Sequence, residues 1–526
     1  MSALIRTLLR AYGLAWQAAT PLLARHKRLA DSFADRLVPE GWPFHAGTEL
    51  KDSVDGVSPL VWIQAASGGE AWLVHALVRA IASLPEVCKQ PLSLLCTTGT
   101  RQGLDVLEKL AAEYAGASTP HTQAEAMPPF TILPRFFPLD KPDLMLRAVR
   151  AARPKAIVLL ETELWPGLLD AAAREHCPVL VLNARMSKKS LSGYKWLSGF
   201  WDTHTPESIF AISPDDAKRF AVLFKKSRVS VMHNIKFDRV AQGLAQSSTP
   251  KAGMEAVANT KALTKASAGA NAGTDAGAGI ETNTDNHVRG LVPGKAPAVP
   301  LIALASVREE EEELLLPAIK ELLAGPAPFA AVRVAVVPRH MHRVQAWQEA
   351  LKKEDLEFIL RSQGDRDKTT PQTGQALPTC MAQRAPILLW DTFGEMQKLY
   401  AMADAVFVGG SLAPLGGQNF LEPLAEGLIP CVGPYIKNFL WVGEDLFDSG
   451  LAVRVQWAGG LADALAARLR ETLEVPPSAG AAPVSIVTWA HARHSARLAV
   501  QERFAAWVAP RTGGSLQAAH ELVRFL

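Results

Sequence analysis

The sequence predicts an α/β protein with two parallel-sheet domains. Short apolar runs recur between longer helical patterns from about residue 60 to residue 231, and the same alternation returns from residue 301 to about residue 432. This alternation is typical of β-α units, whose strands form parallel sheets. A chain of 526 residues is also too long for one hydrophobic core. We therefore expect two Rossmann-like domains facing an interdomain cleft, a common place for a ligand.

The expected strands are runs of aliphatic and aromatic residues bounded by polar or turn-forming segments. In the first domain they cover residues 61–63, 92–95, 157–160, 179–182 and 208–212. In the second domain they cover residues 301–305, 332–337, 387–390, 405–408 and 430–432.

The composition along the chain suggests five parts. Residues 243–298 are rich in Ala, Gly, Thr, Asn and Ser, and they have too few large apolar side chains to offset the entropy of ordering. They are therefore predicted to be a disordered insertion. The expected parts are an N-terminal helix (1–30), a first domain (31–242), the insertion (243–298), a second domain (299–490) and C-terminal helices that cross back to the first domain (491–526).

The N-terminal segment has an unusual pattern of charge. Residues 3–24 are mostly apolar but are interrupted by Arg6 and Arg10, and the basic run 25–28 follows directly. This pattern is typical of an interfacial amphipathic helix with a basic flank on the cytoplasmic side of a membrane. The alternative is a first helix that packs on its own domain, because a stripe of Leu and Ala often belongs to a core.

Charge and cysteine content exclude several classes of protein. The formal net charge is only +3, although residues 1–240 hold 29 Lys and Arg against 23 Asp and Glu. This excess fits an anionic lipid or phosphate but is too small to indicate nucleic acid. The five cysteines are scattered without a CxxC pair, so we expect no zinc or disulfide framework. No pattern indicates a protein partner.

The segment 157–166, IVLLETELWP, places two carboxylates at the end of a buried strand. Four apolar residues are followed at once by Glu161 and Glu163. In open α/β sheets ligands bind beyond the carboxyl ends of the strands, so these acids are expected to lie near a site. The alternative is a pair of solvated or ion-paired acids in a loop.

Other strand ends of the first domain add polar groups. Residues 62–70, WIQAASGGE, place Glu70 where a helix begins, so it is a candidate general base, or an acid that only stabilises the helix dipole. The basic residues of segment 183–197 suit phosphate or carboxylate groups, or form a solvated loop. Lys236, in segment 234–238, could stabilise negative charge or simply be exposed.

Three strand ends of the second domain predict a nucleotide site. They are VPRH (337–340), DTFGEM (391–396) and the glycine-rich VGGSLAPLGGQNFLEPLAEG (408–427). Glycine-rich turns that lead into a helix can bind phosphate through backbone amides, and an acid in the helix can bind ribose hydroxyls. The GxGxxG and P-loop patterns are missing there. The pair Asp365 and Asp367 lies in a predicted loop, so we expect chemistry without a metal.

Together these motifs closely resemble those of the Kdo transferases, GT-B-fold glycosyltransferases that attach 3-deoxy-D-manno-octulosonic acid (Kdo) to lipid A precursor. The matching segments are ASGGE (66–70), FPLDKP (137–142), ETELWP (161–166), NARMS (183–187), NIKFD (234–238), VPRH (337–340), DTFGE (391–395), GGSLAPLGGQN (409–419), FLEP (420–423) and GPYIKNF (433–439). The resemblance covers nearly the whole chain apart from the insertion and the loop at 362–386.

The resemblance implies a role for particular residues. Glu70 falls on the family's proposed catalytic base, and Glu161 and Lys236 fall on positions assigned to transition-state stabilisation. The segments implied in CMP binding contain Pro338, Arg339, Phe393, Gly394, Glu395, Asn419, Phe420, Leu421 and Glu422. The family relation also implies CMP-Kdo as donor, lipid A precursor as acceptor, inversion of the anomeric configuration, no metal or other cofactor, and the cytoplasmic face of the inner membrane as location.

Several positions depart from the family pattern. Gln418, inside the donor motif, stands where the family usually has His, and it can donate a hydrogen bond but cannot carry charge. Gln64 also replaces a His, and Gly167 replaces an Asn. Two other functions therefore remain open: a GT-B transferase or epimerase that uses another nucleotide sugar, and a non-catalytic module that senses nucleotide sugars at a membrane.

Overall fold

The computed structural model describes most of the chain, in ten segments. They are residues 3–26, 29, 32–44, 58–87, 91–116, 130–248, 299–325, 331–365, 385–473 and 486–526. Most of the predicted insertion lies outside these residues. Its first six residues, 243–248, are described and continue a helix.

The chain forms two compact units. Unit 1 consists of Met1–Ala241 and Pro510–Leu526, and unit 2 consists of Gln242–Ala509. The crossing back to the first domain was predicted at residue 491. In the structure the long helix α17 (Ile486–Val508) belongs to unit 2, and the chain returns to unit 1 after Ala509.

Unit 1 contains a seven-stranded parallel sheet in the order β3-β2-β1-β4-β5-β6-β7. Its strands are β1 (Leu60–Ala65), β2 (Leu92–Thr98), β3 (Phe130–Phe136), β4 (Ala156–Leu160), β5 (Val179–Ala184), β6 (Ser208–Ala211) and β7 (Arg228–Val231). Its helices are α1 (Ala3–Ala24), α2 (Gly68–Ala82), α3 (Arg101–Gly116), α4 (Pro142–Ala152), α5 (Pro166–Arg174), α6 (Lys188–Tyr194), α7 (Ser198–Thr203), α8 (Pro214–Leu223), α9 (Ile235–Ser248, which runs into unit 2) and α18 (Gly514–Val523), with short 3₁₀ turns η2 (Ala34–Leu37) and η4 (Lys195–Leu197).

Both faces of this sheet are buried, and this explains the continuous apolar runs in its strands. In β4, Ile157 and Leu159 belong to one core cluster, whereas Val158 and Leu160 belong to the cluster on the other face. Side chains of a strand alternate between the two faces, and all five residues of β4 are buried and apolar. The first polar residue after this strand is Glu161, directly at the strand end.

Unit 2 contains a second seven-stranded parallel sheet, in the order β10-β11-β9-β8-β12-β13-β14. Its strands are β8 (Leu301–Val307), β9 (Arg333–Pro338), β10 (Phe358–Leu360), β11 (Ile387–Leu389), β12 (Ala405–Val408), β13 (Pro430–Val432) and β14 (Val453–Arg454). Besides α17, its helices are α11 (Glu312–Leu323), α12 (Val344–Lys353), α13 (Met396–Met402), α14 (Leu421–Ala425), α15 (Asp445–Asp448) and α16 (Leu461–Thr472), with 3₁₀ turns η5 (Glu309–Glu311), η6 (Met341–Arg343), η7 (Arg361–Asp365), η9 (Lys437–Val442), η10 (Ala458–Gly460) and η11 (Ala509–Arg511).

Both sheets have a point where the strand order reverses. In unit 1 the chain builds outward from β1 to β3 on one side and then continues from β4 on the other. In unit 2 the same reversal lies between β8 and β12. The carboxyl ends of the strands at such a switch point are the usual ligand site of open α/β sheets. The predicted fold class, α/β with two Rossmann-like parallel-sheet domains, is confirmed.

Helix α1 is packed on unit 1 as well as exposed to solvent. Ile5 and Leu9 are 4% and 6% exposed and belong to the core cluster on one face of the sheet. Leu14 and Leu22 are 66% and 70% exposed. Among the described residues, no helix is long and apolar enough to cross a membrane. The helix thus combines the two alternatives left open by its sequence, a packed inner face and an apolar outer face.

Candidate active site

Two predicted catalytic residues of unit 1 follow adjacent strands at the switch point. Glu70 lies in the first turn of α2, which follows β1. Glu161 is the first residue after β4, the strand paired with β1. Lys236 is the second residue of α9, and its ammonium group reaches Glu161. The structure therefore places these three groups, which are far apart in sequence, on the same edge of one sheet.

Glu70 is held against the loop before its helix. Its carboxylate accepts hydrogen bonds from the Ala66 amide (2.6 Å) and the Ser67 hydroxyl (3.3 Å). Ser67 is the N-cap of α2 and accepts a hydrogen bond from the Glu70 amide. Glu70 thus lies in the first helical turn, where its charge also favours the helix dipole, the role that the alternative interpretation gave it. The pKa of Glu70 is raised to about 7, chiefly by burial and also by the negative charges of Glu161 and Glu163. The hydrogen bond from the Ala66 amide lowers the pKa and offsets part of this rise. A carboxylate with this pKa suits a general base at neutral pH.

Glu161 and Lys236 form a close ion pair. The Lys236 Nζ lies 2.5 Å from Glu161 Oε1, and the Arg185 guanidinium lies 4.0 Å from the other oxygen. Glu161 also has a positive φ of 60°, a conformation that costs energy for a residue with a side chain. Such strained residues concentrate at functional sites, where the surrounding structure holds them in place.

Two asparagines fix the start of the helix that carries Lys236. Asn234 Oδ1 accepts a hydrogen bond from the Lys236 amide at 3.0 Å. Asn183, fully buried at the end of β5, accepts a hydrogen bond from the Ile235 amide at 2.9 Å. These contacts satisfy amides at the N-terminus of α9 and fix the direction of the Lys236 side chain.

Glu163, the second acid after β4, is held by neutral donors, whereas its sequence left an ion pair open as the alternative. Its Oε2 accepts hydrogen bonds from the Trp165 indole (2.6 Å) and the Gln64 amide (3.4 Å). Gln64 is itself buried and accepts a hydrogen bond from the Thr97 hydroxyl at 2.6 Å. Burial raises the pKa of Glu163, so a neutral donor network, not a salt bridge, surrounds this acid. The sequence alone could not show this contact, because it depends on the pairing of β1 with β4.

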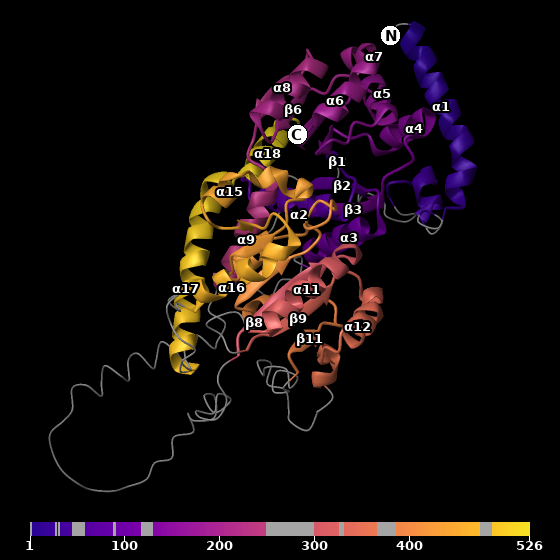
Figure 1. The fold of residues 1–526 in the computed structure, drawn as a ribbon. Coiled ribbons are helices and arrows are strands. Elements are labelled where there is room, and N and C mark those ends of the chain that lie inside the picture. The colour runs from indigo at the N-terminus through magenta and orange to yellow at the C-terminus, as the bar shows by residue number, and fades with distance from the viewer. Residues whose placement is uncertain are drawn as a thin grey trace, which may run out of the picture. The chain divides into compact units, whose positions relative to one another are not determined.

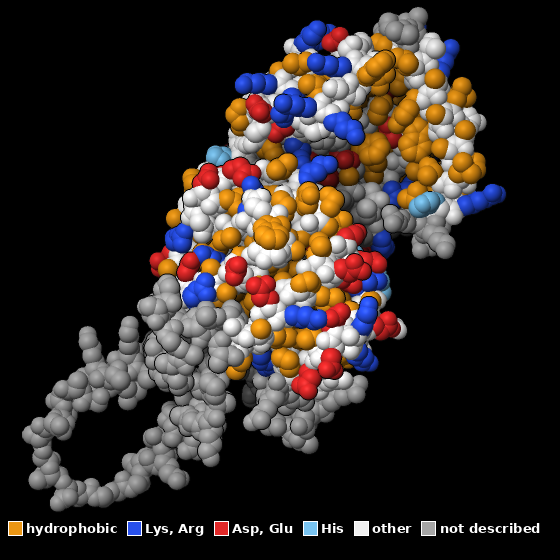
Figure 2. Space-filling view, viewed as in Figure 1, with side chains coloured by type: hydrophobic (Ala, Val, Ile, Leu, Met, Phe, Trp, Pro, Cys, Tyr) orange, Lys and Arg blue, Asp and Glu red, His pale blue; other side chains and the backbone are white. Residues whose placement is uncertain are grey.

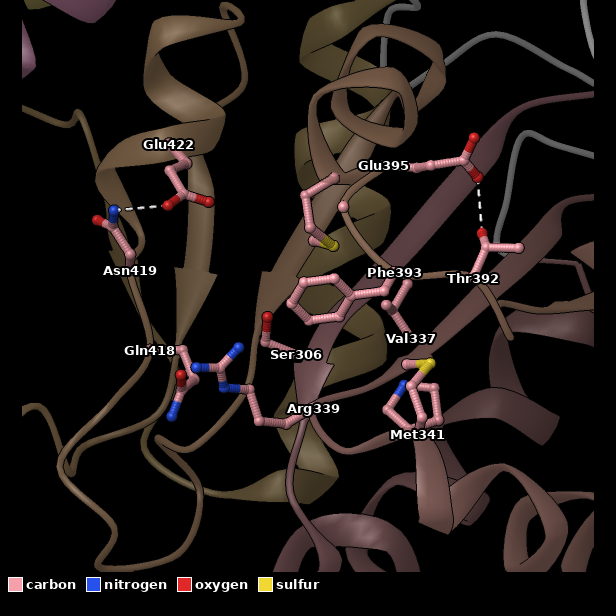
Figure 3. Close-up of a pocket in the computed structure, with 13 residues that line it drawn as sticks. Ser306, Val337, Arg339, Met341, Thr392, Phe393, Glu395, Gln418, Asn419 and Glu422 are labelled. Carbon is pink, nitrogen blue, oxygen red and sulfur yellow. Dashed lines mark hydrogen bonds between the residues drawn. The ribbon is translucent and has the colours of Figure 1, made fainter. Parts of the chain in front are cut away.

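Unit 2 has a pocket at the carboxyl ends of β8, β9 and β11 and in the loop after β12. Its volume is about 260 Å³, and Figure 3 shows the side chains that point into it. The lining residues are Ser306, Val337, Pro338, Arg339, Met341, Thr392, Phe393, Gly394, Glu395, Met396, Gln418, Asn419 and Glu422. Seven of the nine predicted nucleotide-binding residues are thus brought together, all except Phe420 and Leu421.

The pocket offers one cation, one aromatic ring and several hydrogen-bonding groups. Among the described residues that line it, Arg339 is the one Lys or Arg, and it lies beside Gln418 and Ser306 in Figure 3. Phe393 is 82% exposed, so its ring is free to stack on a planar ligand. This combination suits a nucleoside phosphate, with the guanidinium on the phosphate and the ring on the base or sugar.

Glu395 is held in its charged form at the edge of this pocket. It accepts hydrogen bonds from the Thr392 hydroxyl (2.6 Å), Lys398 (2.9 Å) and Arg361 (3.3 Å). Partial burial raises its pKa, but the Thr392 and Lys398 hydrogen bonds and the charge of Arg361 together lower the pKa below the ordinary value. An ionised carboxylate accepts hydrogen bonds only, so it fits a ribose hydroxyl or a base amino group.

Phe420 and Leu421 do not line the pocket. Phe420 is fully buried and packs on Phe439 at a ring-centre distance of 4.9 Å, and Leu421 is 2% exposed. Their burial anchors the segment that presents Asn419 and Glu422, which are joined by a 2.8 Å hydrogen bond. The sequence motif mixed residues that line the pocket with residues that support it.

The first glycine-rich turn does not offer its amides to a ligand. The amides of Gly410, Ser411 and Leu412 all donate to the carboxylate of Glu311, at 2.6 to 2.8 Å. Glu311 is fully buried and also accepts from the Arg308 amide. The expectation that these amides bind phosphate is therefore wrong, because the chain supplies its own anion there.

The surface of unit 1 carries separate apolar and basic regions (Figure 2). Hydrophobic side chains gather along α1, where Leu14 and Leu22 are exposed. Lys and Arg side chains gather over α6 and α8, which contribute the exposed Lys188, Lys189 and Lys218. In the described part of the chain, no group of three or more His, Cys, Asp or Glu residues is arranged to hold a metal ion.

Comparison with known proteins agrees with the sequence motifs. Residues 40–239 match the family model of 3-deoxy-D-manno-octulosonic-acid transferase (kdotransferase). The chain is 28% identical to the 3-deoxy-D-manno-octulosonic acid transferase of Bordetella pertussis over 75% of its length and 76% of that protein. It is 27% identical to the enzyme of the same name from Haemophilus influenzae, over 72% of this chain and 71% of that one.

Among solved structures, the C-terminal CMP-Kdo binding domain of WaaA from Acinetobacter baumannii is similar to part of the chain. The sequence identity is 25%, and the match covers 38% of this chain and 89% of that domain, with a TM-score of 0.27.

The fold and the matched family agree on one class of enzyme, and the chain is a glycosyltransferase of GT-B architecture. Within that class, the resemblance predicted from the motifs is confirmed. The chain is a relative of the Kdo transferases.

Proposed function

We propose that this protein transfers Kdo from CMP-Kdo to a lipid A precursor, with inversion at the anomeric carbon and without a metal or other cofactor. The observation that carries the proposal is Glu70, a partly buried carboxylate with a pKa of about 7 next to the Glu161–Lys236 ion pair. Glu70 takes the proton of the acceptor hydroxyl while its oxygen attacks the anomeric carbon, and the CMP phosphate departs.

The neighbouring charges support this chemistry. A carboxylate such as Glu161 stabilises an oxocarbenium-like centre, as carboxylates do in glycosidases. Lys236 supplies positive charge for the Kdo carboxylate or the departing phosphate. In unit 2, Arg339, Phe393 and the carboxylate of Glu395 suit the phosphate, the base and the ribose of CMP.

The surface of unit 1 supports an acceptor that carries phosphate and acyl chains at a membrane. The lysines on α6 and α8 suit phosphate groups, and the exposed leucines of α1 suit the boundary between lipid headgroups and acyl chains. We propose that α1 lies on the cytoplasmic face of the inner membrane. Replacing Leu14 and Leu22 with Gln should weaken sedimentation with anionic vesicles, whereas unchanged sedimentation would contradict this role.

The decisive experiment is mass spectrometry of products formed from CMP-Kdo and lipid A precursor. The wild-type protein should add Kdo, and Glu70→Ala should make no product while still binding CMP, because the pocket lies in unit 2. Product from a UDP-sugar but not from CMP-Kdo would favour another nucleotide-sugar enzyme. Product with neither donor would favour the non-catalytic sensor.

A further inference from the structure

Helix α1 contacts the core of unit 1 through one face. Ile5, Leu9 and Tyr12 are spaced so that they share that face, and α1 lies beside α4. Ile5 and Leu9 are buried in the core, and the Tyr12 hydroxyl donates a hydrogen bond to Asp140 Oδ2 at 2.9 Å. The helix is therefore connected to a specific carboxylate inside the unit.

Asp140 caps a different helix. It is 1% exposed, and its two oxygens accept hydrogen bonds from the amides of Gly167 and Leu168, both at 2.8 Å. These amides lie in the first turn of α5, whose own N-cap residue, Trp165, makes no side-chain capping bond. Asp140 thus replaces the missing cap from a distant part of the sequence.

The close approach of Asp140 depends on Gly167. A Cβ atom at position 167 would lie 2.5 Å from the Asp140 carbonyl oxygen and 2.8 Å from its Oδ1, distances that would force the two segments apart. The packing of Asp140 against the start of α5 is therefore closely fitted.

Helix α5 directly follows the segment 161–165 of the candidate active site. Trp165 ends that segment, and its indole holds the carboxylate of Glu163. Four residues before the helix begins, the Thr162 hydroxyl donates to the Arg185 carbonyl oxygen. A shift of the start of α5 would therefore be passed along a short, hydrogen-bonded stretch of backbone to Glu161.

We infer that Tyr12 and Asp140 are positioning residues for the segment 161–165, so that helix α1 helps to set the geometry of the Glu161 carboxylate. Neither residue contacts that carboxylate. They act through the first turn of α5. The effect on catalysis rests on the proposed function, whereas the effect on the order of the segment does not.

The test compares Tyr12→Phe with Thr20→Val. Tyr12→Phe keeps the ring and removes only the hydroxyl that reaches Asp140. Thr20→Val also removes one hydroxyl from α1, but this hydroxyl donates to the Trp16 carbonyl oxygen of the same helix. The variant is therefore a matched control. Hydrogen exchange by mass spectrometry on the full-length protein would report on residues 161–170, and Kdo transfer would report kcat and the KM for CMP-Kdo.

Tyr12→Phe should speed amide exchange in residues 161–170 by about three- to tenfold, the effect of losing one hydrogen bond. It should lower kcat by a similar factor and leave the donor KM unchanged, because the CMP pocket lies in unit 2. Thr20→Val should change none of these quantities. A purely structural role would lower the melting temperature but leave kcat of the folded protein unchanged.

Asp140→Asn provides a second arm. The Asn amide group cannot accept both α5 hydrogen bonds, so this variant should show a larger loss of kcat, and adding Tyr12→Phe to it should have little further effect. Unchanged exchange in Tyr12→Phe, or additive effects in the double variant, would overturn the inference. Faster exchange with unchanged kcat would refute the link to catalysis. If wild-type protein makes no product, the proposed function fails, and the exchange data still decide the positioning role.

Discussion

The pH dependence of Kdo transfer is the most direct test of Glu70. A general base works in its deprotonated form, so the rate should rise with pH through the Glu70 pKa of about 7. About 9% of Glu70 would be ionised at pH 6 and about 91% at pH 8, so kcat should rise about tenfold between these values. With an ordinary pKa near 4.5, the rate would change by only a few per cent over the same range.

Glu163→Gln should shift this profile. The negative charge of Glu163 contributes to the raised pKa of Glu70, so its removal should lower the midpoint, by less than one unit because burial is the larger cause. Glu175→Gln is a suitable control, because it removes the same charge at the other end of α5. The assay is the initial rate of product formation at saturating donor and acceptor. A flat profile from pH 6 to pH 8, with transfer intact, would refute the assignment of Glu70 as the base.

Three other predictions concern the ion pair, the pocket and the C-terminal helix. Lys236→Met should abolish transfer and cost about 1–3 kcal/mol of unfolding free energy, because Glu161 loses the nearer of its two cations. Adding Glu161→Gln should restore most of that stability in urea titrations. Arg339→Ala should weaken CMP binding about tenfold, as measured by calorimetry, with little change in melting temperature. An unchanged affinity for CMP would show that Arg339 does not bind the phosphate. Asp238→Asn should destabilise unit 1 by about 1–3 kcal/mol, because Asp238 accepts hydrogen bonds from two amides at the start of α18. Unchanged amide hydrogen exchange in residues 513–523 would contradict this role.

The first catalytic cluster could be predicted from the sequence because it depends on strand ends. The run 157–160 is buried on both faces of the sheet, so the first polar side chain after it, Glu161, must lie at the sheet edge. The same argument places Glu70 after β1. The sequence alone could not show that β1 and β4 are neighbours, because strand order depends on packing between distant segments.

The errors share one physical origin, which is a contact between residues far apart in the chain. Glu311 binds the turn at 410–412, about a hundred residues later, so the glycine pattern alone suggested a phosphate site that the protein fills itself. Glu163 accepts hydrogen bonds from an indole and an amide, whereas its sequence left an ion pair open. Local sequence indicates which groups are polar, but not which distant partner satisfies them.

The return of the chain to unit 1 after Ala509 affects how this protein can fold during synthesis. Ala518, Ala519 and Leu522 of α18 belong to the core cluster that covers one face of the first sheet, and Asp238 binds the start of that helix. Nearly all of unit 1 leaves the ribosome before unit 2, yet this core stays open until α18 is made. Unit 1 must therefore remain partly assembled, with apolar surface exposed, while unit 2 is being translated.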